Sequence, residues 1–442
     1  MGDVSSTVRF TPHWTQSFPP HILLPAAVSA VSAAILLIRG EWDTGGMIVF
    51  ACVFALSPVM ALWAEVRRRR TVCEIRGGLV IYRTPSIEKK LRLDRAERTE
   101  IRVSPFSRLT GCVKLTLYPD FSRRAWLSVR IPRQSAAAVI DTTAPIGTEI
   151  GRIHPGRHSS AIFAVTSDQS ALLLITSAYF TLFAKGSRGI NALALLTLAA
   201  AIIHMLLSFA KHRRLLLSRH QNGCRVTTGF LGGKSIFIPD RAAVGAVVRY
   251  SHAGTICGFG SVSLISSGGT EILVACHVGQ SEGKDMAFRL LRTAGGTNAL
   301  LSQPETLKKD ASAALAASLF AALIAAFVCI RSESDVVRTL SCVCGAFMFG
   351  TAMRCLAGLT NADRSGLRIS PSVLCAGGVS VRGSEYCFLR RECVAGMRIS
   401  SRLLRRMNGL CSAVVFAKGG IRSVKCRCVP VLALDGLVNR FC

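Results

Sequence analysis

The sequence is poor in acidic and aromatic residues. Its 442 residues include 25 aspartates and glutamates against 54 lysines and arginines, a formal net charge of +29, and only 7% are aromatic. Proteins that bind nucleic acid are often this basic, but they use aromatic side chains to stack on bases. Half of the residues are hydrophobic and the mean hydropathy is +0.41. We therefore expect no nucleic-acid partner, and we expect the charged and apolar residues to be segregated along the chain.

Motifs that would indicate an enzyme or a metal site are also missing. No G-x-x-x-x-G-K-[ST] loop is present, and the stretch "GFLGGKS" at 229–235 fits a hairpin turn better than a phosphate loop. The cysteines of "CVC" (342–344) and "CRC" (426–428) lack the C-x-x-C spacing of a structural zinc site. No nucleophile and base can be assembled from these motifs. We expect a non-enzymatic protein with no catalytic residue, no cofactor and no metal.

The spacing of the seventeen cysteines and nine histidines does not indicate a functional site. The cysteines are odd in number and have no framework spacing, so in a cytosolic setting they are expected to be reduced and mostly buried. His154 and His158 are four residues apart, but Pro155 and Gly156 between them disfavour a helix that would align them. A solvated linker is the expected structure there.

Long apolar runs are the main feature that is present. A membrane-spanning helix needs about 20 apolar residues, and six runs reach or approach that length. They lie at residues 22–38, 47–66, 168–184, 190–210, 311–330 and 336–356. Short loops join them in three pairs, which predicts three helical hairpins in a membrane. No cleavable signal peptide is evident, because the first run follows about twenty polar residues without a basic start.

The stretches outside these hairpins carry almost all of the positive charge. Basic residues outnumber acidic ones by 20 to 8 in residues 67–158, by 13 to 5 in 211–309 and by 14 to 4 in 359–442. Because lysine and arginine near membrane helices stay on the cytoplasmic side, we expect a multi-pass cell-membrane protein with both termini in the cytoplasm. The predicted segments are 1–21 (tail), 22–66 (hairpin), 67–158 (domain and linker), 159–210 (hairpin), 211–309 (domain), 310–358 (hairpin) and 359–442 (domain).

A threefold repeat is suggested by the soluble stretches. Gly111, Gly260 and Gly409 precede similar strands and are spaced by 149 residues, the length of a hairpin plus a domain. In each domain, short strands with glycine-rich turns precede an expected closing helix, at 133–140, 280–291 and 431–441. This order suggests a small antiparallel barrel or sandwich capped by a helix. The glycine fits a tight turn or bulge where a side chain would clash.

The arrangement resembles the bacterial pleckstrin-homology-like (PH-like) domain membrane proteins of the YdbT type. The residues that carry the resemblance are strand openings such as "CRVTT" (224–228), the turn "IPDR" (238–241), the basic connector in "SSRLLRRMNGLCSAVVF" (400–416), and the helix pair before each domain. The resemblance implies a polytopic α-helical membrane protein with six transmembrane helices and three cytoplasmic β-rich PH-like domains, each capped by a C-terminal helix. It implies no defined activity.

Three basic clusters are the candidate binding residues. Juxtamembrane lysine and arginine attract an anionic leaflet, each contributing about 1 kcal/mol, although such residues also serve only to fix topology. The candidates for contact with the membrane surface are Arg67, Arg68, Arg69, Arg70, Lys211, Arg213, Arg214, Arg402, Arg405 and Arg406.

The function expected from the sequence is that of a membrane scaffold. Its basic domains would lie on the anionic inner leaflet and bind lipid headgroups or protein partners, another membrane protein among them. The alternative is a transport or export component, for which ionisable residues within the spans, such as His204 and Arg338, would be the pointers. The sequence does not indicate an oligomeric state.

Overall fold

The computed structural model describes residues 8–16, 31, 44–76, 78–122, 124–135, 147–153, 157–183, 188–229, 233–293, 304–360, 366–369, 372–380, 383–400, 410–417 and 423–430. Two compact units divide the chain. Unit 1 holds residues 1–149 together with 220–225 and 231–238, and unit 2 holds the remainder. The division falls within four strands: β8 (Glu149–Ile153), β9 (Leu216–His220), β10 (Gly223–Thr228) and, at its last residue, β11 (Gly233–Pro239).

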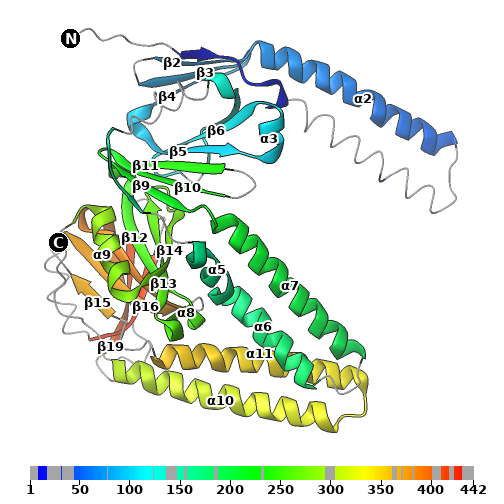
Figure 1. Ribbon diagram of the computed structural model, residues 1–442, viewed down its shortest axis with the longest axis vertical. Coiled ribbons are helices and arrows are strands. Elements are labelled where there is room, and N and C mark those ends of the chain that lie inside the picture. The colour runs from blue at the N-terminus through cyan, green and yellow to red at the C-terminus, as the bar shows by residue number, and fades with distance from the viewer. Residues whose placement is uncertain are drawn as a thin grey trace. The chain divides into compact units, whose positions relative to one another are not determined.

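Unit 1 contains one long helix and two groups of antiparallel strands (Figure 1). The first group has the order β1 (Val8–Phe10), β2 (Val72–Arg76), β3 (Leu79–Arg83) and β4 (Glu88–Arg92). The second has the order β7 (Leu127–Pro132), β6 (Cys112–Pro119), β5 (Ala96–Val103) and β11 (Gly233–Pro239). The other elements of the unit are η1 (Trp14–Gln16), α2 (Thr44–Arg69), η2 (Leu93–Arg95) and α3 (Pro105–Leu109).

The core of unit 1 follows from the alternation of its strands. In β2, Cys73 and Ile75 are fully buried, whereas the residues between and beside them are not. In β7, Val129 and Ile131 are likewise buried and alternate with residues that are not. Successive side chains of a strand point to opposite faces, so every second residue joins the core. Phe10 of β1 packs into the same cluster.

Unit 2 combines helices with β-strands. Its helices are α5 (Arg157–Thr166), α6 (Asp168–Phe183), α7 (Arg188–His212), α8 (His252–Cys257), α9 (Gln280–Leu291), α10 (Pro304–Arg331) and α11 (Asp335–Thr360). Its strands and short turns are η3 (Asp240–Ala242), β12 (Ala243–Tyr250), β13 (Phe259–Ser266), β14 (Glu271–Gly279), β15 (Gly366–Ile369), β16 (Val373–Ser380), β17 (Gly383–Arg390), η5 (Arg391–Cys393), β18 (Val394–Ser400), β19 (Leu410–Ala417) and β20 (Ser423–Pro430).

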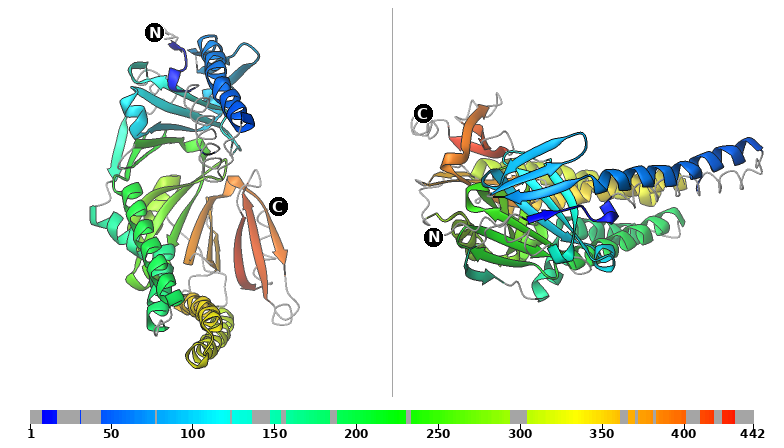
Figure 2. Two further views of the ribbon diagram at one scale, coloured as in Figure 1. Left: turned by 90° about the vertical axis from the view of Figure 1, so that its right-hand side faces the viewer. Right: turned by 90° about the horizontal axis from the view of Figure 1, so that it is seen from above.

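The strands of unit 2 form a six-stranded sheet and a three-stranded sheet. The six-stranded order is β14-β13-β12-β17-β16-β15, and the second sheet is β18-β19-β20. Figure 2 shows the green strands of the 240–280 region beside the orange strands that follow α11. Leu374, Leu389 and Val415 are buried together with Val247, so the core of the unit is built from strands far apart in sequence.

The predicted fold class, with six membrane helices in three hairpins, is wrong. Among the described residues, three helices are long and apolar enough to cross a membrane: Arg188–His212, Ala311–Arg331 and Asp335–Met353. The helix α2 covers the second predicted span but is not among them. The first predicted span, 22–38, lies outside the described residues except at position 31.

The third predicted span, 168–184, corresponds to α6, and the chain bends directly before this helix. Ser159–Thr166 and Gln169–Phe183 meet at an angle of 52° and make a fourth candidate only if the bent pair crosses as one. The cause is Ser167, whose side chain accepts a hydrogen bond from the backbone N–H of Ser170 at 3.3 Å and so starts a new helix. Two of the apolar helices, α10 and α11, run side by side as a hairpin (Figures 1 and 2).

The expected segregation of strands into three PH-like domains is also not what the structure contains. β11, from the second predicted domain, pairs with β5 of the first, and β12 of the second pairs with β17 of the third. Some apolar residues of these paired strands are buried: Phe237 in β11, and Cys387 and Phe388 in β17. Pairing removes open strand edges that would otherwise expose these residues and their backbone groups.

The three helices that were predicted to close the domains compare differently with the structure. The helix expected at 280–291 is α9, which packs on β12 and β13. The helix expected at 133–140 begins at 133–135 and the rest is outside the described residues, as is all of 431–441. The threefold repeat and the domain boundaries stay predictions.

The glycines at the start of the aligned strands serve two different purposes. Gly111 has a φ of +66° with open space around it, so its backbone conformation requires glycine. A Cβ at Gly260 would lie 2.7 Å from the ring of Tyr250 and 2.8 Å from the carbonyl of Arg249, so close packing requires it there. Gly409 lies outside the described residues.

Candidate functional site

The end of α2 brings four consecutive arginines to one turn of helix, Arg67 to Arg70. Positive side chains are favourable there because the helix dipole places partial negative charge at the C-terminus. Thr71 closes the helix: its hydroxyl donates to the carbonyl of Arg67 at 2.8 Å, and its N–H donates to the carbonyl of Arg68 at 2.9 Å. The chain then enters β2 at Val72.

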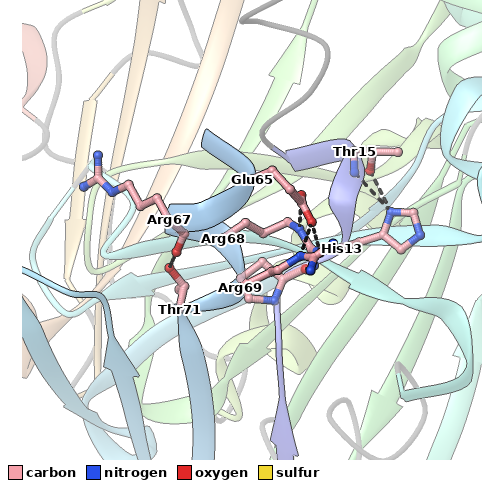
Figure 3. Close-up of polar contacts among 8 residues, drawn as sticks. His13, Thr15, Glu65, Arg67, Arg68, Arg69 and Thr71 are labelled. Carbon is pink, nitrogen blue, oxygen red and sulfur yellow. Dashed lines mark hydrogen bonds and ion pairs between the residues drawn. The ribbon is translucent and has the colours of Figure 1, made fainter. Parts of the chain in front are cut away.

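Arg68 points inward and is engaged within unit 1. Its Nε and Nη2 donate to the carboxylate of Glu65 at 2.7 and 2.6 Å, and its Nη1 donates to the carbonyl of Pro12 at 2.7 Å (Figure 3). The paired guanidinium lowers the pKa of Glu65 from 4.5 to about 2, chiefly through the hydrogen bond from Arg68. Arg68 therefore has a structural role. Its position in a run of four arginines did not distinguish it from its neighbours.

The segment that Arg68 holds lies within the predicted tail, 1–21. In this segment β1 pairs with β2, with Phe10 opposite Cys73, and the turn η1 follows. His13 contacts the hydroxyl of Thr15 through Nδ1 at 2.9 Å. Burial, with smaller contributions from Arg68 and Arg130, lowers the pKa of His13 below its ordinary value of 6.5. The alternation in "VRF" (8–10) was a signal for this strand, but it is only three residues long.

Arg67, Arg69 and Arg70 face outward. The side chain of Arg69 is 76% exposed although its Nε contacts Glu65 at 2.9 Å, and Arg67 and Arg70 are exposed too. The guanidinium of Arg67 lies over the ring of Trp63 at 5.4 Å, a cation–π contact one helical turn apart. Beside them, a cavity of about 250 Å³ is lined by Trp63, Arg67, Arg68, Tyr82 and the N-terminal segment.

Apolar side chains cover the preceding turns of the same helix. Five of them are exposed: Val59, Met60, Leu62, Trp63 and Val66. Exposed apolar residues in a group mark a surface that contacts a membrane or a partner. A tryptophan followed by arginines at a helix end is the order found where a helix leaves the apolar layer of a bilayer.

The second predicted cluster lies at the end of α7, in unit 2. Lys211 is exposed and His212 is buried. Arg213 lies over the ring of Phe209 at 5.7 Å, again one helical turn away, and Arg214 is exposed. This cluster directly follows one of the three helices that are long enough to cross a membrane.

The third predicted cluster, Arg402, Arg405 and Arg406, lies outside the described residues, so the structure gives no account of it.

Within the part of the chain that the structure does describe, no three histidine, cysteine or acidic side chains are placed to hold a metal ion. Thirteen of the described cysteines are free thiols, and eight of these are buried.

The ionisable residues predicted to matter for transport have local partners. Nδ1 of His204 in α7 is 2.9 Å from the hydroxyl of Ser170 in α6. Arg338 donates to the carbonyl of Ser332 at 2.8 Å and lies 3.6 Å from Asp335, so it fixes the loop between α10 and α11.

Comparison with known proteins identifies no relative: no family model, no curated protein and no solved structure matches this chain.

Proposed function

We propose that this chain is a non-enzymatic integral membrane protein whose exposed arginines at the end of α2 bind the headgroups of anionic phospholipids. The observation that carries the proposal is the order of side chains along α2. Exposed apolar residues, Trp63 among them and Val66 the last, precede the exposed arginines Arg67, Arg69 and Arg70. An anionic bilayer offers the matching sequence of environments, apolar first and negatively charged next.

Three further helices support a membrane location. α7, α10 and α11 contain the candidate spans, and many of their large apolar side chains are exposed, including Leu196, Leu323 and Phe347. Such a surface is costly in water and favourable in lipid. In the proposed topology the basic residues that follow α2 and α7 lie on the cytoplasmic side, as the distribution of lysine and arginine favours.

The role of the anionic lipid would be to hold unit 1 at the membrane surface. Arg68 is committed to Glu65 and to the carbonyl of Pro12, so the binding charge would come from Arg67 and Arg70, with a smaller part from Arg69. Each exposed arginine near an anionic leaflet contributes about 1 kcal/mol. Removing Arg67 and Arg70 should therefore weaken the preference for anionic lipid by about 2 kcal/mol, roughly thirtyfold.

The proposal is tested by lipid selection. The full-length protein is reconstituted in equimolar phosphatidylglycerol and phosphatidylcholine, extracted gently, and its retained lipids are counted by native mass spectrometry. We expect retained phosphatidylglycerol in the wild type and its loss in R67Q/R70Q. The matched control is K89Q/K90Q, which removes two exposed charges from β4 of the same unit. Equal retention in R67Q/R70Q and wild type would overturn the proposal.

One observation favours the transport alternative. Ser170 and His204 form a polar contact between two apolar helices. Ionisable residues within membrane helices often mark the pathway of a transported ion or substrate. If the protein transports a solute, H204A should change its flux into proteoliposomes. The scaffold function predicts that H204A leaves both flux and lipid selection unchanged.

A further inference from the structure

A second cavity, in unit 2, is separate from the arginines of α2. It has a volume of about 380 Å³ and is walled by the ends of α5 and α7 and by β12, β13 and β14. Its lining includes Lys211, His212, Arg249, Phe259, Glu271 and His277. The volume is within the range of small-molecule sites.

His277 is turned toward this cavity by an irregularity in the sheet. Gly260 pairs with Val278 and the next residue, Ser261, pairs with Cys276, so His277 is the extra residue of a β-bulge. Its φ is +57°, a conformation that non-glycine residues rarely adopt. Its ring stacks on Phe259 with centroids 3.7 Å apart. Bulges commonly re-aim a side chain near a functional site, and such backbone strain persists where surrounding contacts hold it.

Three buried nitrogens of the lining have no hydrogen-bond partner among the described residues. They are Nδ1 of His277, Nδ1 of His212 and Nε of Arg249. His212 itself is only 9% exposed. Buried polar groups are nearly always paired in folded proteins, so several orphaned nitrogens around one cavity need an explanation. A bound ligand that offers acceptor oxygens would supply the missing partners.

The charge of the cavity favours an anion. Arg249 is paired with Glu271 at 2.9 Å and with Glu385, which does not line the cavity, at 3.2 Å. Among the lining residues, the charges of Arg249 and Glu271 compensate one another. Lys211 is exposed at the lining and forms no ion pair with any described acidic residue. What remains is one lysine charge beside the nitrogens of His212, His277 and Arg249.

The cavity also adjoins the ends of membrane-length helices. Lys211 and His212 are the last residues of α7, which passes as a candidate span, and Thr166 and Ser167 stand at the break between α5 and α6. The polar ends of spanning helices lie at the depth of lipid headgroups. A headgroup phosphate could therefore reach this cavity, and so could a soluble phosphate compound.

We propose that this cavity binds a phosphate group, with Lys211 supplying the positive charge and His277 and His212 donating hydrogen bonds to its oxygens. Arg249, fixed by its two carboxylates, is a positioning residue at the inner wall. The site does not include Arg67 or Arg70. Phosphate binding in this cavity and lipid binding by those arginines can therefore be confirmed or contradicted separately.

The test is calorimetric titration of the full-length protein in a neutral detergent. Three probes are used: dihexanoyl phosphatidic acid, glycerol 3-phosphate and inorganic phosphate. We expect saturable binding of at least one of them. Binding of the lipid alone identifies a headgroup site, whereas binding of glycerol 3-phosphate or phosphate as well identifies a soluble ligand.

Two variants make the site specific. H277N removes the imidazole and keeps a residue that tolerates positive φ, and K211Q removes an exposed charge with little risk to folding. Each should weaken the titrated binding at least tenfold while R67Q/R70Q leaves it unchanged. K309Q, an exposed lysine of α10 outside the lining, is the matched control. Saturation of none of the three probes, or equal affinity in K211Q and wild type, would overturn the proposal.

Discussion

Arg68 and Glu65, one turn apart in α2, are joined by two hydrogen bonds of 2.7 and 2.6 Å, and the same guanidinium reaches the carbonyl of Pro12. The pair therefore links the helix to the N-terminal segment. It also separates the arginines of this turn by role: Arg68 is structural, and Arg67 and Arg70 remain exposed.

Replacing Arg68 should loosen the segment at residues 8–16. R68Q removes the charged donors and leaves Glu65 and the carbonyl of Pro12 without this partner. Because both side chains are partly exposed to water, we expect a loss of about 1 kcal/mol. Hydrogen exchange of the full-length protein should show faster exchange at 8–16. R70Q, which removes an exposed arginine from the same turn, should leave that exchange unchanged, and equal rates in all three proteins would contradict the assignment.

The same segment should loosen as the pH falls. The pKa of Glu65 is about 2 in the folded protein against 4.5 ordinarily, so its stabilising contribution is present above pH 4.5 and is lost as pH falls towards 2. The lowered pKa of His13 acts in the same direction from pH 6.5 downward, because the unfolded chain gains a proton before the folded one does. Protection factors at 8–16, which correct for the intrinsic pH dependence of amide exchange, should fall with acid, less so in E65Q below pH 4.5. A pH-independent pattern in the wild type would contradict both shifts.

Gly260 should not accept a side chain. In G260A the new methyl would lie 2.7 Å from the ring of Tyr250 and 2.8 Å from the carbonyl of Arg249. Overpacking of this kind costs about 1 to 3 kcal/mol, and we expect a lower thermal midpoint in detergent. G151A is the control, since nothing lies within 4 Å of a Cβ there. Equal midpoints for the two variants would show that the close approach is not rigid.

The edge strand β4 should limit self-association. β4 ends the sheet β1-β2-β3-β4 among the described strands, and it carries exposed Lys89 and Lys90. Lysines on an edge oppose pairing with another sheet. In K89I/K90F we expect larger assemblies by sedimentation velocity. R83I adds an exposed apolar residue on β3, which is paired on both sides, and should stay like wild type; the same behaviour in K89I/K90F would contradict the role of the lysines.

Local patterns in the sequence predicted several elements well. Three long apolar runs correspond to the candidate spans in α7, α10 and α11, and the amphipathic stretch at 280–291 is α9. Each depends on residues within a few helical turns. The predicted run at 168–184 begins directly after the break at Ser167 and matches α6, but α5, which precedes the break, was not predicted as a separate helix.

Non-local features could not be read from the sequence. The pairing of β12 with β17 joins residues about 140 positions apart, and strand alternation specifies which face is buried but not which strand lies alongside. The inward position of Arg68 depends on the distant Pro12. The bulge that turns His277 into a cavity depends on the register between β13 and β14.

The most direct test of the central claim uses Trp63 as a probe of the lipid beside Arg67 and Arg70. Quenching by brominated phosphatidylglycerol is compared with quenching by brominated phosphatidylcholine in reconstituted full-length protein, with W63F subtracting the other three tryptophans. Anionic lipid should quench Trp63 more strongly, high salt should reduce the difference, and R67Q/R70Q should abolish it. Equal quenching of Trp63 by the two lipids at low salt would contradict the proposed binding of anionic headgroups.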